Sequence, residues 1–419
     1  MEDTTAIRFK RPESFRDELT EVLRRGARQL VAQAVEGELR ELLEEHGGRK
    51  LRDGRSAVVR NGYQPEREVV TGIGAVPVRI PRVRSRDGAP VAFHSALVPP
   101  YVRRSQSLDA AIPWLYLKGV AAGEMAEALG ALVGESARGL SANVVSRLKR
   151  EWEAEHREWS KRDLSGDRWV YLWADGIYSR LRGTSARLCV LVVIGANERG
   201  EKHLLAVEDG VRESTQSWRE LLLGLKRRGL AEAPKLAVGD GATGFWGALE
   251  EVYGSTRQQR CWVHKTRNVL NYLPKSSQPK AKQALHEIWM AETREKADAA
   301  FDWFIETYDD AYPKAANCLL KDREELLAFY DFPKQQWVHL RTTNPIESTF
   351  ATIRHRTARI KGCVSRNTML AMIYKLGACA QTHWRRLRGF DKLAKVIRDV
   401  RFVDGIEQTS DNDQTRDAA

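Results

Sequence analysis

Three carboxylates in the sequence have residue types and positions suited to metal-dependent phosphoryl transfer. Asp175 follows the apolar run Trp169–Ala174, and Asp240 follows the shorter run Leu236–Val238. Glu347 lies in the first turn of a predicted helix. Two-metal phosphoryl transfer needs about three carboxylates that converge on ions roughly 3.5–4 Å apart, and Mg²⁺ or Mn²⁺ prefers such oxygen ligands. These residues therefore predict a site for two Mg²⁺ or Mn²⁺ ions.

Each of the three carboxylates also has a purely structural interpretation. Asp175 and Asp240 are both followed by glycine, and Asp-Gly pairs are common in turns. Asn344, Pro345 and Glu347 match a helix capping box, in which the glutamate bonds back to the cap residue. Three clustered carboxylates without a cation would repel one another, so their convergence in space would favour a metal site.

Cys261 and His264 form a Cys-x-x-His motif that allows several interpretations. Together with Cys379 and His383 they could form a zinc site, although the second pair lies in a predicted helix without a compact finger around it. Alternatively, Cys261 packs in the strand after Gln259 while His264 points toward the carboxylates. An ordinary solvated or core histidine remains the other interpretation of His264.

Basic side chains cluster in two segments where they could neutralise phosphates. One cluster follows Glu347 on its helix and comprises Arg354, Arg356, Arg359 and Lys361. The other comprises Arg147, Lys149 and Arg150, on the last of three short helices predicted for residues 108–117, 122–129 and 143–152. This second pattern outlines a helix-turn-helix, but a three-helix bundle with a solvated basic face would also produce it.

The elements that must position the carboxylates follow from the hydrophobic pattern. Apolar runs predict strands at residues 169–174, 188–194, 204–207 and 236–238, and helices at 217–230 and 245–253. Three strands, a helix, a strand and a helix is the order of a ribonuclease H-like sheet. Residues 279–330 have helical periodicity throughout, which predicts an all-helical insertion.

The amino-terminal part has a different texture. Residues 14–45 predict one or two amphipathic helices, and residues 67–84 predict an arginine-flanked β-hairpin. The predicted fold class is multidomain α/β. Its predicted regions are 1–60 (N-terminal helical), 61–105 (small β-hairpin, DNA-binding), 106–165 (helix-turn-helix-like, DNA-binding), 166–265 (ribonuclease H-like core, first part), 266–340 (helical insertion), 341–403 (core, last part) and 404–419 (disordered tail).

Composition narrows the class of protein. The 419 residues include 68 Lys and Arg against 56 acidic residues, and the formal charge of +12 favours a polyanionic partner such as double-stranded DNA. Five scattered cysteines do not suggest a disulfide framework and fit a reducing compartment. The longest apolar run, Leu188–Ile194, is too short to span a membrane, so we expect a cytoplasmic, nucleoid-associated protein without a membrane partner.

Four short sequences together resemble those of bacterial insertion-sequence transposases of the mutator type, relatives of the mutator-like elements of plants. They are YLWADGIY at 171–178, VGDG at 238–241, CWVHK at 261–265 and TNPIESTF at 343–350. The gaps between the three acidic residues are 64 residues (240 − 175 − 1) and 106 residues (347 − 240 − 1). The resemblance extends to RNGY at 60–63 and LKGV at 117–120, so it covers most of the chain.

The resemblance implies a DDE-type transposase, with Asp175, Asp240 and Glu347 as its catalytic metal ligands. Such an enzyme binds the terminal repeats of its element, hydrolyses the phosphodiester at the element end and joins the 3′ hydroxyl to target DNA. The resemblance also implies that His264 orients a phosphate or a water, and that a homodimer or larger assembly is active. The alternatives are a nuclease or recombinase that cuts without joining, and a non-catalytic DNA-binding protein derived from a transposase.

Overall fold

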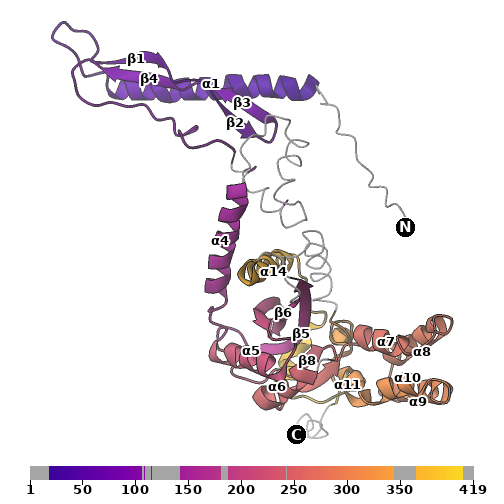
Figure 1. The fold of residues 1–419 in the computed structure, drawn as a ribbon. Coiled ribbons are helices and arrows are strands. Elements are labelled where there is room, and N and C mark those ends of the chain that lie inside the picture. The colour runs from indigo at the N-terminus through magenta and orange to yellow at the C-terminus, as the bar shows by residue number, and fades with distance from the viewer. Residues whose placement is uncertain are drawn as a thin grey trace, which may run out of the picture. The chain divides into compact units, whose positions relative to one another are not determined.

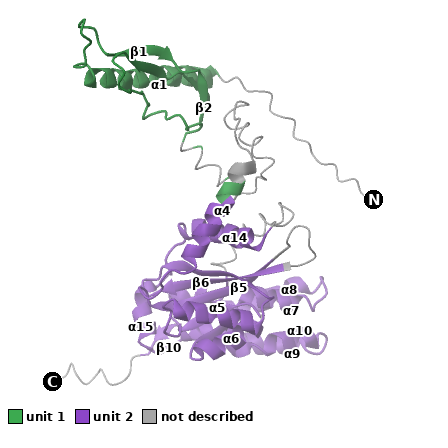
Figure 2. Cartoon of the chain, turned by 60° about the vertical axis from the view of Figure 1, so that its left-hand side comes forward, with its two compact units in different colours: residues 1–148 green, residues 149–419 purple. Residues whose placement is uncertain are grey.

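The computed structural model describes residues 18–105, 108, 115, 142–180, 187–241, 243–343 and 365–408. The chain forms two compact units, residues 1–148 and residues 149–419, which are coloured separately in Figure 2. Across these described ranges, no helix is both long and apolar enough to cross a membrane.

Unit 1 combines one long helix with two pairs of strands. Helix α1 (Glu18–Glu45) packs against the hairpin of β2 (Arg67–Thr71) and β3 (Gly74–Val78), and against the antiparallel pair β1 (Val58–Tyr63) and β4 (Pro81–Ser85). Their shared core comprises Val35, Leu39, Val69, Val76, Val78, Ile80, Phe93 and Val98. The predicted helix and hairpin are confirmed. Pairing of β1 with β4 was not predicted, because Pro81 both ends the hairpin pattern and begins β4.

Helix α4 (Ala142–Trp159) corrects the boundary predicted near residue 152. The helix expected at 143–152 and the charged helix after it form one continuous helix. The continuity follows from packing, since Trp152 is buried and His156 Nε2 lies 3.0 Å from the carbonyl oxygen of Val207. Glu153 further accepts a hydrogen bond from Thr368 of helix α14 (Arg366–Gln381). The carboxyl-terminal half of α4 is therefore part of unit 2.

Unit 2 is built on a mixed five-stranded sheet, visible at the centre of this unit in Figure 1. Its strand order is β7-β6-β5-β8-β9. The first three strands in sequence, β5 (Trp169–Arg180), β6 (Arg187–Asn197) and β7 (Lys202–Gly210), are antiparallel. Strands β8 (Leu236–Gly239) and β9 (Arg257–Arg260) run parallel to β5. The mixed α/β class is thus confirmed for this unit.

Helices cover both faces of the sheet. Helices α5 (Thr215–Arg227) and α6 (Thr243–Tyr253) bury Trp218, Leu222 and Phe245 against one face. Helix α14 packs on β7 from the other face, where Gly377 lies close to Leu204. That face is also covered by the segment containing η1 (Ala328–Asp331), η2 (Lys334–Gln336) and α12 (Trp337–Leu340). The buried parts of β5, β6 and β8 are consequently apolar on both faces, as the continuous hydrophobic runs in their sequences predicted.

Residues 262–327 consist of helices joined by turns, which confirms the helical structure predicted for residues 279–330. The helices are α7 (Trp262–Leu270), α8 (Gln278–Met290), α9 (Arg294–Tyr308), α10 (Pro313–Leu320) and α11 (Arg323–Leu327). Figure 1 shows α7 to α10 extending to one side of the sheet. Their cores are apolar, and Phe301 and Phe304 of α9 are fully buried.

The carboxyl-terminal end of the described chain departs from the composition-based prediction. After η3 (Phe390–Lys392) and α15 (Leu393–Ile397), strand β10 (Phe402–Val403) pairs with β11 (Ile406–Glu407). Gly405 donates a hydrogen bond to the carbonyl oxygen of Tyr330, which attaches this hairpin to unit 2. Residues 404–408, assigned to a disordered tail on polar composition, are therefore ordered by contacts with remote residues, and residues 409–419 lie outside the described chain.

Candidate active site

Asp175 lies within β5 rather than after it. The strand continues to Arg180 because β6 pairs with it along its whole length, and Asp175 is opposite Val192. Side chains alternate along a strand, so Asp175 shares a face with Tyr171 and Trp173. Its side chain is buried, with the residue only 6% exposed. The turn interpretation of this aspartate is thus wrong, and a buried carboxylate in a central strand needs another explanation.

Asp240 lies one residue beyond the end of β8. The parallel register pairs Trp173 of β5 with Val238 of β8. The pairing ends there, and an extension of its register by two residues places Asp240 level with Asp175. Neighbouring strands are about 4.8 Å apart, so the two aspartates occupy corresponding positions at the carboxyl-terminal edge of the β5–β8 pair. The 64 residues between them in the sequence gave no hint of this register.

The third predicted ligand, Glu347, lies outside the described residues, as do Arg354, Arg356, Arg359 and Lys361. The chain is described up to Thr343, four residues before Glu347, and Thr343 is fully buried. Both its backbone nitrogen and its hydroxyl oxygen lie 3.3 Å from Sγ of Cys261. The backbone N–H of Cys261 in turn donates to the carbonyl oxygen of Gly239, at 2.8 Å. Cys261 thereby connects the residue before Asp240 to the described end of the segment that leads to Glu347.

These contacts decide between several interpretations of the Cys-x-x-His motif at Cys261 and His264. Cys261 is not in a strand but is the N-cap residue of α7, directly after β9. Burial raises the pKa of its thiol, which makes it a poor thiolate ligand. All four cysteines and histidines of the zinc hypothesis are described, and no three of them form a group that could hold a metal. The zinc hypothesis is therefore wrong.

His264 follows one turn into α7 and is half-buried. Asn268, on the same side of the helix four residues later, lies near the glycine after Asp240: a Cβ on Gly241 would be 3.9 Å from its Nδ2. This side of α7 thus borders the Asp240 loop. A role for His264 in orienting a phosphate or water stays a prediction.

Glu213 is a further acidic residue of the site, and sequence analysis missed it. It precedes Ser214, the N-cap of α5, in the loop after β7. A Cβ on Gly176 would lie 2.5 Å from Cδ of Glu213, so the glycine after Asp175 leaves the space that this carboxylate fills. Glu213 lies on the face of β5 opposite to Asp175, because Gly176 is the next residue along the strand. The only signal in the sequence was an acidic residue ahead of a helix cap.

Asp240 and Glu213 interact electrostatically, so this region carries more than one acidic group. Burial, together with the negative charge of Asp240, raises the pKa of Glu213 to about 7. Its Oε2 atom is buried without a hydrogen-bond partner among the described residues. Carboxylate oxygens that are crowded in this way are the donors that Mg²⁺ and Mn²⁺ bind. Within the described ranges, however, no three acidic, His or Cys side chains form a complete metal-binding group, and Glu347 lies outside them.

The raised pKa of Glu213 predicts a pH-dependent stability of the metal-free protein. Between about pH 4.5 and 7 the unfolded chain loses the Glu213 proton while the folded chain keeps it, so stability falls as pH rises through this window. Glu213→Gln should remove this contribution and stabilise the protein above pH 7 by on the order of 2 kcal/mol. Urea unfolding followed by tryptophan fluorescence at several pH values measures this.

The matched control is Glu251→Gln, which alters an exposed glutamate paired with Arg219. We expect this control to leave the pH profile unchanged. An unchanged profile for Glu213→Gln would mean that the carboxyl group is not held in the buried, crowded position described here.

The predicted DNA-contacting cations of α4 lie at its amino-terminal half. Arg147 and Arg150 are exposed and Lys149 is half-buried. They precede Trp152, where the helix becomes buried in unit 2. The helices predicted at 108–117 and 122–129 lie outside the described chain except for Leu108 and Leu115, so the helix-turn-helix stays a prediction.

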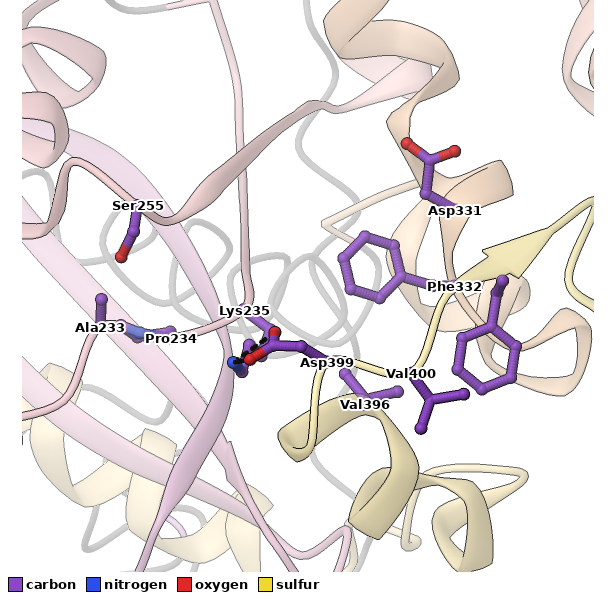
Figure 3. Close-up of a pocket in the computed structure, with 10 residues that line it drawn as sticks. Ala233, Pro234, Lys235, Ser255, Asp331, Phe332, Val396, Asp399 and Val400 are labelled. Carbon is purple, nitrogen blue, oxygen red and sulfur yellow. Dashed lines mark hydrogen bonds and ion pairs between the residues drawn. The ribbon is translucent and has the colours of Figure 1, made fainter. Parts of the chain in front are cut away.

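A separate pocket lies at the opposite edge of the sheet. It is shown in Figure 3, and Lys235, Asp331, Phe332 and Asp399 are among its lining residues. Lys235 directly precedes β8 and pairs with Asp399 at 2.6 Å, whereas Asp240 follows the other end of the same strand. The charged lining residues of this pocket are paired, Lys235 with Asp399 and Asp331 with Arg257, and it lies at the end of β8 away from Asp240, so it is not the candidate site.

Comparison with known proteins finds one matching family model and several similar proteins. Residues 2–386 match the family model described as "Transposase, Mutator family". The chain is 50% identical over 282 residues to the transposase for insertion sequence element IST2 of Acidithiobacillus ferrooxidans, which covers 67% of this chain and 95% of that protein. It is 46% identical over 294 residues to the transposase for element IS6120 of Mycolicibacterium smegmatis, covering 70% and 90% respectively. The transposase for element IS905 of Lactococcus lactis is 30% identical over 301 residues, covering 72% and 74%.

Proposed function

The chain belongs to the Mutator family of insertion-sequence transposases, and we propose that it cuts and joins DNA by the DDE mechanism, with Asp175, Asp240 and Glu347 as its metal ligands. The observation that carries this proposal is the register of β5 and β8, whose extension by two residues places Asp240, directly after β8, level with Asp175 in β5. A second observation is the Glu213 carboxyl group, which interacts with the charge of Asp240 and has a buried oxygen without a hydrogen-bond partner among the described residues; it supports a cation near Asp240.

We further propose that the sheet of unit 2 is a ribonuclease H-like core. Three antiparallel strands followed by two parallel strands, in the order β7-β6-β5-β8-β9, support this assignment. The helices between β9 and residue 343 then form an insertion between the second and third carboxylates. Such a core leaves the carboxyl-terminal edge of β5 and β8 as the place where an extended DNA strand would reach both aspartates.

The reaction consists of two displacements at phosphorus. In the first, water attacks the phosphodiester at an element end, and the bond to the 3′ oxygen breaks. In the second, the freed 3′ hydroxyl attacks a target phosphodiester, the bond from phosphorus to the 3′ oxygen of the target strand breaks, and that oxygen leaves as a new 3′ hydroxyl. Bound Mg²⁺ or Mn²⁺ would activate the attacking oxygen and stabilise the leaving one. Asp175 lies within a central strand and Asp240 directly follows another, so little reorganisation of their oxygens is needed during the reaction. Because two element ends must be held together, the proposed active form contains at least two copies of the chain.

The function is tested by incubating the full chain with labelled double-stranded DNA that carries the element's own ends. We expect cleavage at the 3′ ends of the element and joining to a second DNA, both dependent on Mg²⁺ or Mn²⁺. Cleavage without joining would indicate a nuclease, and binding without cleavage in either metal would indicate a DNA-binding protein. Either result would contradict the proposed function.

Unit 1 offers a surface for the DNA backbone. Arg82, Arg84 and Arg86 alternate along and just beyond β4, and all three are exposed, while Val83 between them packs toward the core with α1. Alternate residues share one face and are about 7 Å apart. The neighbouring carboxylates pair with other arginines, Asp87 with Arg49 and Asp53 with Arg55, and Arg86 interacts with Asp53 only at longer range. We propose that this arginine row binds successive phosphates without reading the sequence.

Removal of the arginine row should weaken DNA binding in a salt-dependent way. If three phosphate contacts are lost in Arg82→Gln/Arg84→Gln/Arg86→Gln, the slope of log affinity against log salt should become shallower by about 2.7. Fluorescence anisotropy with element-end DNA between low and moderate salt measures the slope.

The control for this triple variant is Arg49→Gln/Asp87→Asn, which removes an ion pair of 2.7 Å in the same unit without changing the net charge. We expect its slope to equal that of the wild type. A wild-type slope for the triple variant would show that the row does not contact DNA.

A further inference from the structure

The main-chain carbonyl of Asp240 is held by two side-chain donors. Trp246 of α6 donates its indole N–H at 3.0 Å, and Arg260 of β9 donates from Nη1 at 2.8 Å. The two donors also contact each other, since the guanidinium of Arg260 lies 4.8 Å from the centre of the Trp246 ring. The peptide group that carries the Asp240 carboxylate is therefore fixed from two directions, although it lies in a loop beyond the end of β8.

Arg260 also reaches a buried ion pair of the helical insertion. Its Nη2 lies 3.7 Å from Asp322, which forms a buried ion pair with Lys265 of α7. Lys265 additionally donates to the carbonyl oxygen of Cys318, at 2.8 Å. The planar guanidinium of Arg260 can contact the Asp240 carbonyl and the Asp322 carboxylate at the same time through two different nitrogens. A lysine has a single ammonium group and cannot make both contacts with this geometry. Arg260 thus links the Asp240 loop to α7 and α10 of the insertion.

Stability alone gives a poor account of Arg260. Its side chain is 13% exposed, and its Nε is buried without a hydrogen-bond partner in the described part of the chain. A buried cation with an unsatisfied donor costs free energy, and an apolar residue of similar size is often as stable or more so. The two hydrogen bonds to one carbonyl are better explained by a need for a fixed Asp240.

We propose that Arg260 is a positioning residue, which aims the Asp240 carboxylate at the metal by fixing its peptide group and couples this loop to the helical insertion through Asp322. The proposal rests on the proposed function, in which Asp240 is a metal ligand. Residues that orient a metal ligand from behind typically contribute 10–100-fold to metal affinity or activity. Arg260 acts in this way through the backbone of the ligand and does not touch the metal.

The test uses Arg260→Lys in the full chain, with Trp246→Phe as a second variant that removes only the other donor to the same carbonyl. We expect Mn²⁺ affinity, measured by the loss of the free-ion electron paramagnetic resonance signal, to fall by about 10–100-fold in Arg260→Lys. Excess Mn²⁺ should restore part of the cleavage rate. The affinity for element-end DNA and the midpoint of urea unfolding should remain near the wild-type values.

The matched control is Arg257→Lys, on the same strand, where the arginine pairs with exposed Asp331 at 3.5 Å. It should bind Mn²⁺ like the wild type. Wild-type Mn²⁺ affinity in both Arg260→Lys and Trp246→Phe would overturn the proposal. So would a loss of affinity in Arg260→Lys that merely follows the fraction of unfolded protein.

Failure of the proposed function would look different. In that case the wild-type chain would show no Mn²⁺ binding that depends on Asp240, and no metal-dependent cleavage. If the wild type binds Mn²⁺ through Asp240 and cleaves DNA while Arg260→Lys matches it in both measurements, only the positioning role fails.

Discussion

Asp240→Asn should lower the rate of metal-dependent cleavage by on the order of a thousandfold or more, while the affinity for element-end DNA is retained. Asparagine has nearly the same size as aspartate but lacks the negative charge that holds a divalent ion. The proposed DNA contacts of the arginine row of unit 1 do not depend on this charge. Cleavage of labelled ends in Mg²⁺ and Mn²⁺, together with anisotropy binding, separates the two effects.

A matched control for Asp240→Asn exists on the same unit. Asp399→Asn removes an aspartate that pairs with Lys235, the residue directly before the start of β8. The cleavage rate of this variant should stay within about twofold of the wild-type rate.

A further readout of Asp240→Asn is independent of metal and of activity. Because the charge of Asp240 helps to raise the pKa of Glu213, Asp240→Asn should narrow the pH window over which Glu213 lowers stability. Cleavage in Asp240→Asn at a rate near that of the wild type would contradict the catalytic assignment.

Trp173→Ala should destabilise unit 2 by about 3–5 kcal/mol, the largest stability effect that we expect. Trp173 is fully buried on β5, two residues before Asp175, and its indole N–H donates to the carbonyl oxygen of His339 at 3.0 Å. Alanine would leave a cavity between the sheet and the segment at 328–340, and it would also remove this hydrogen bond. Domain stabilities are commonly about 5–15 kcal/mol, so a large part of the folding free energy would be lost.

Urea unfolding followed by tryptophan fluorescence measures this loss. The signal comes mainly from unit 2, because Trp114 is the single tryptophan that precedes residue 149. The matched control is Trp303→Ala, since Trp303 of α9 is 53% exposed. Its effect should stay within about 0.5 kcal/mol. A loss of less than about 1 kcal/mol for Trp173→Ala would show that the sheet does not pack on this segment as described.

The two predictions are connected by β5, since this strand carries both Trp173 and Asp175, the proposed partner of Asp240 in metal binding. Odd-numbered residues of this strand first bury aromatic rings, Tyr171 and Trp173, and then present the carboxylate of Asp175. The apolar part anchors the strand between two layers, and the anchored strand keeps the carboxylate in place. A rigid support of this kind is what a metal ligand requires.

The sequence by itself determined the class of the protein and most of its elements. Continuous apolar runs are a local property, so they located β5, β6, β7 and β8 and the helices after them. The helical periodicity of residues 279–330 was equally local. The motifs around Asp175, Asp240 and Cys261 indicated the transposase family, which the comparisons confirmed.

Only the tertiary structure decided where chemistry-bearing groups meet, because such contacts depend on pairing between residues far apart in the chain. Pairing with β6 extends β5 past Asp175, so that an expected strand end became a strand interior. The register with β8, extended by two residues, places Asp240 level with Asp175. The loop after β7 places Glu213 against Gly176, although the sequence around Glu213 carries no motif. Packing on α14 and β7 kept α4 helical beyond residue 152, and the contacts of Cys261 with Gly239 and Thr343 replaced a zinc site by a structural link. Periodicity records which face of an element is buried, whereas register and loop placement depend on partners that no local pattern identifies.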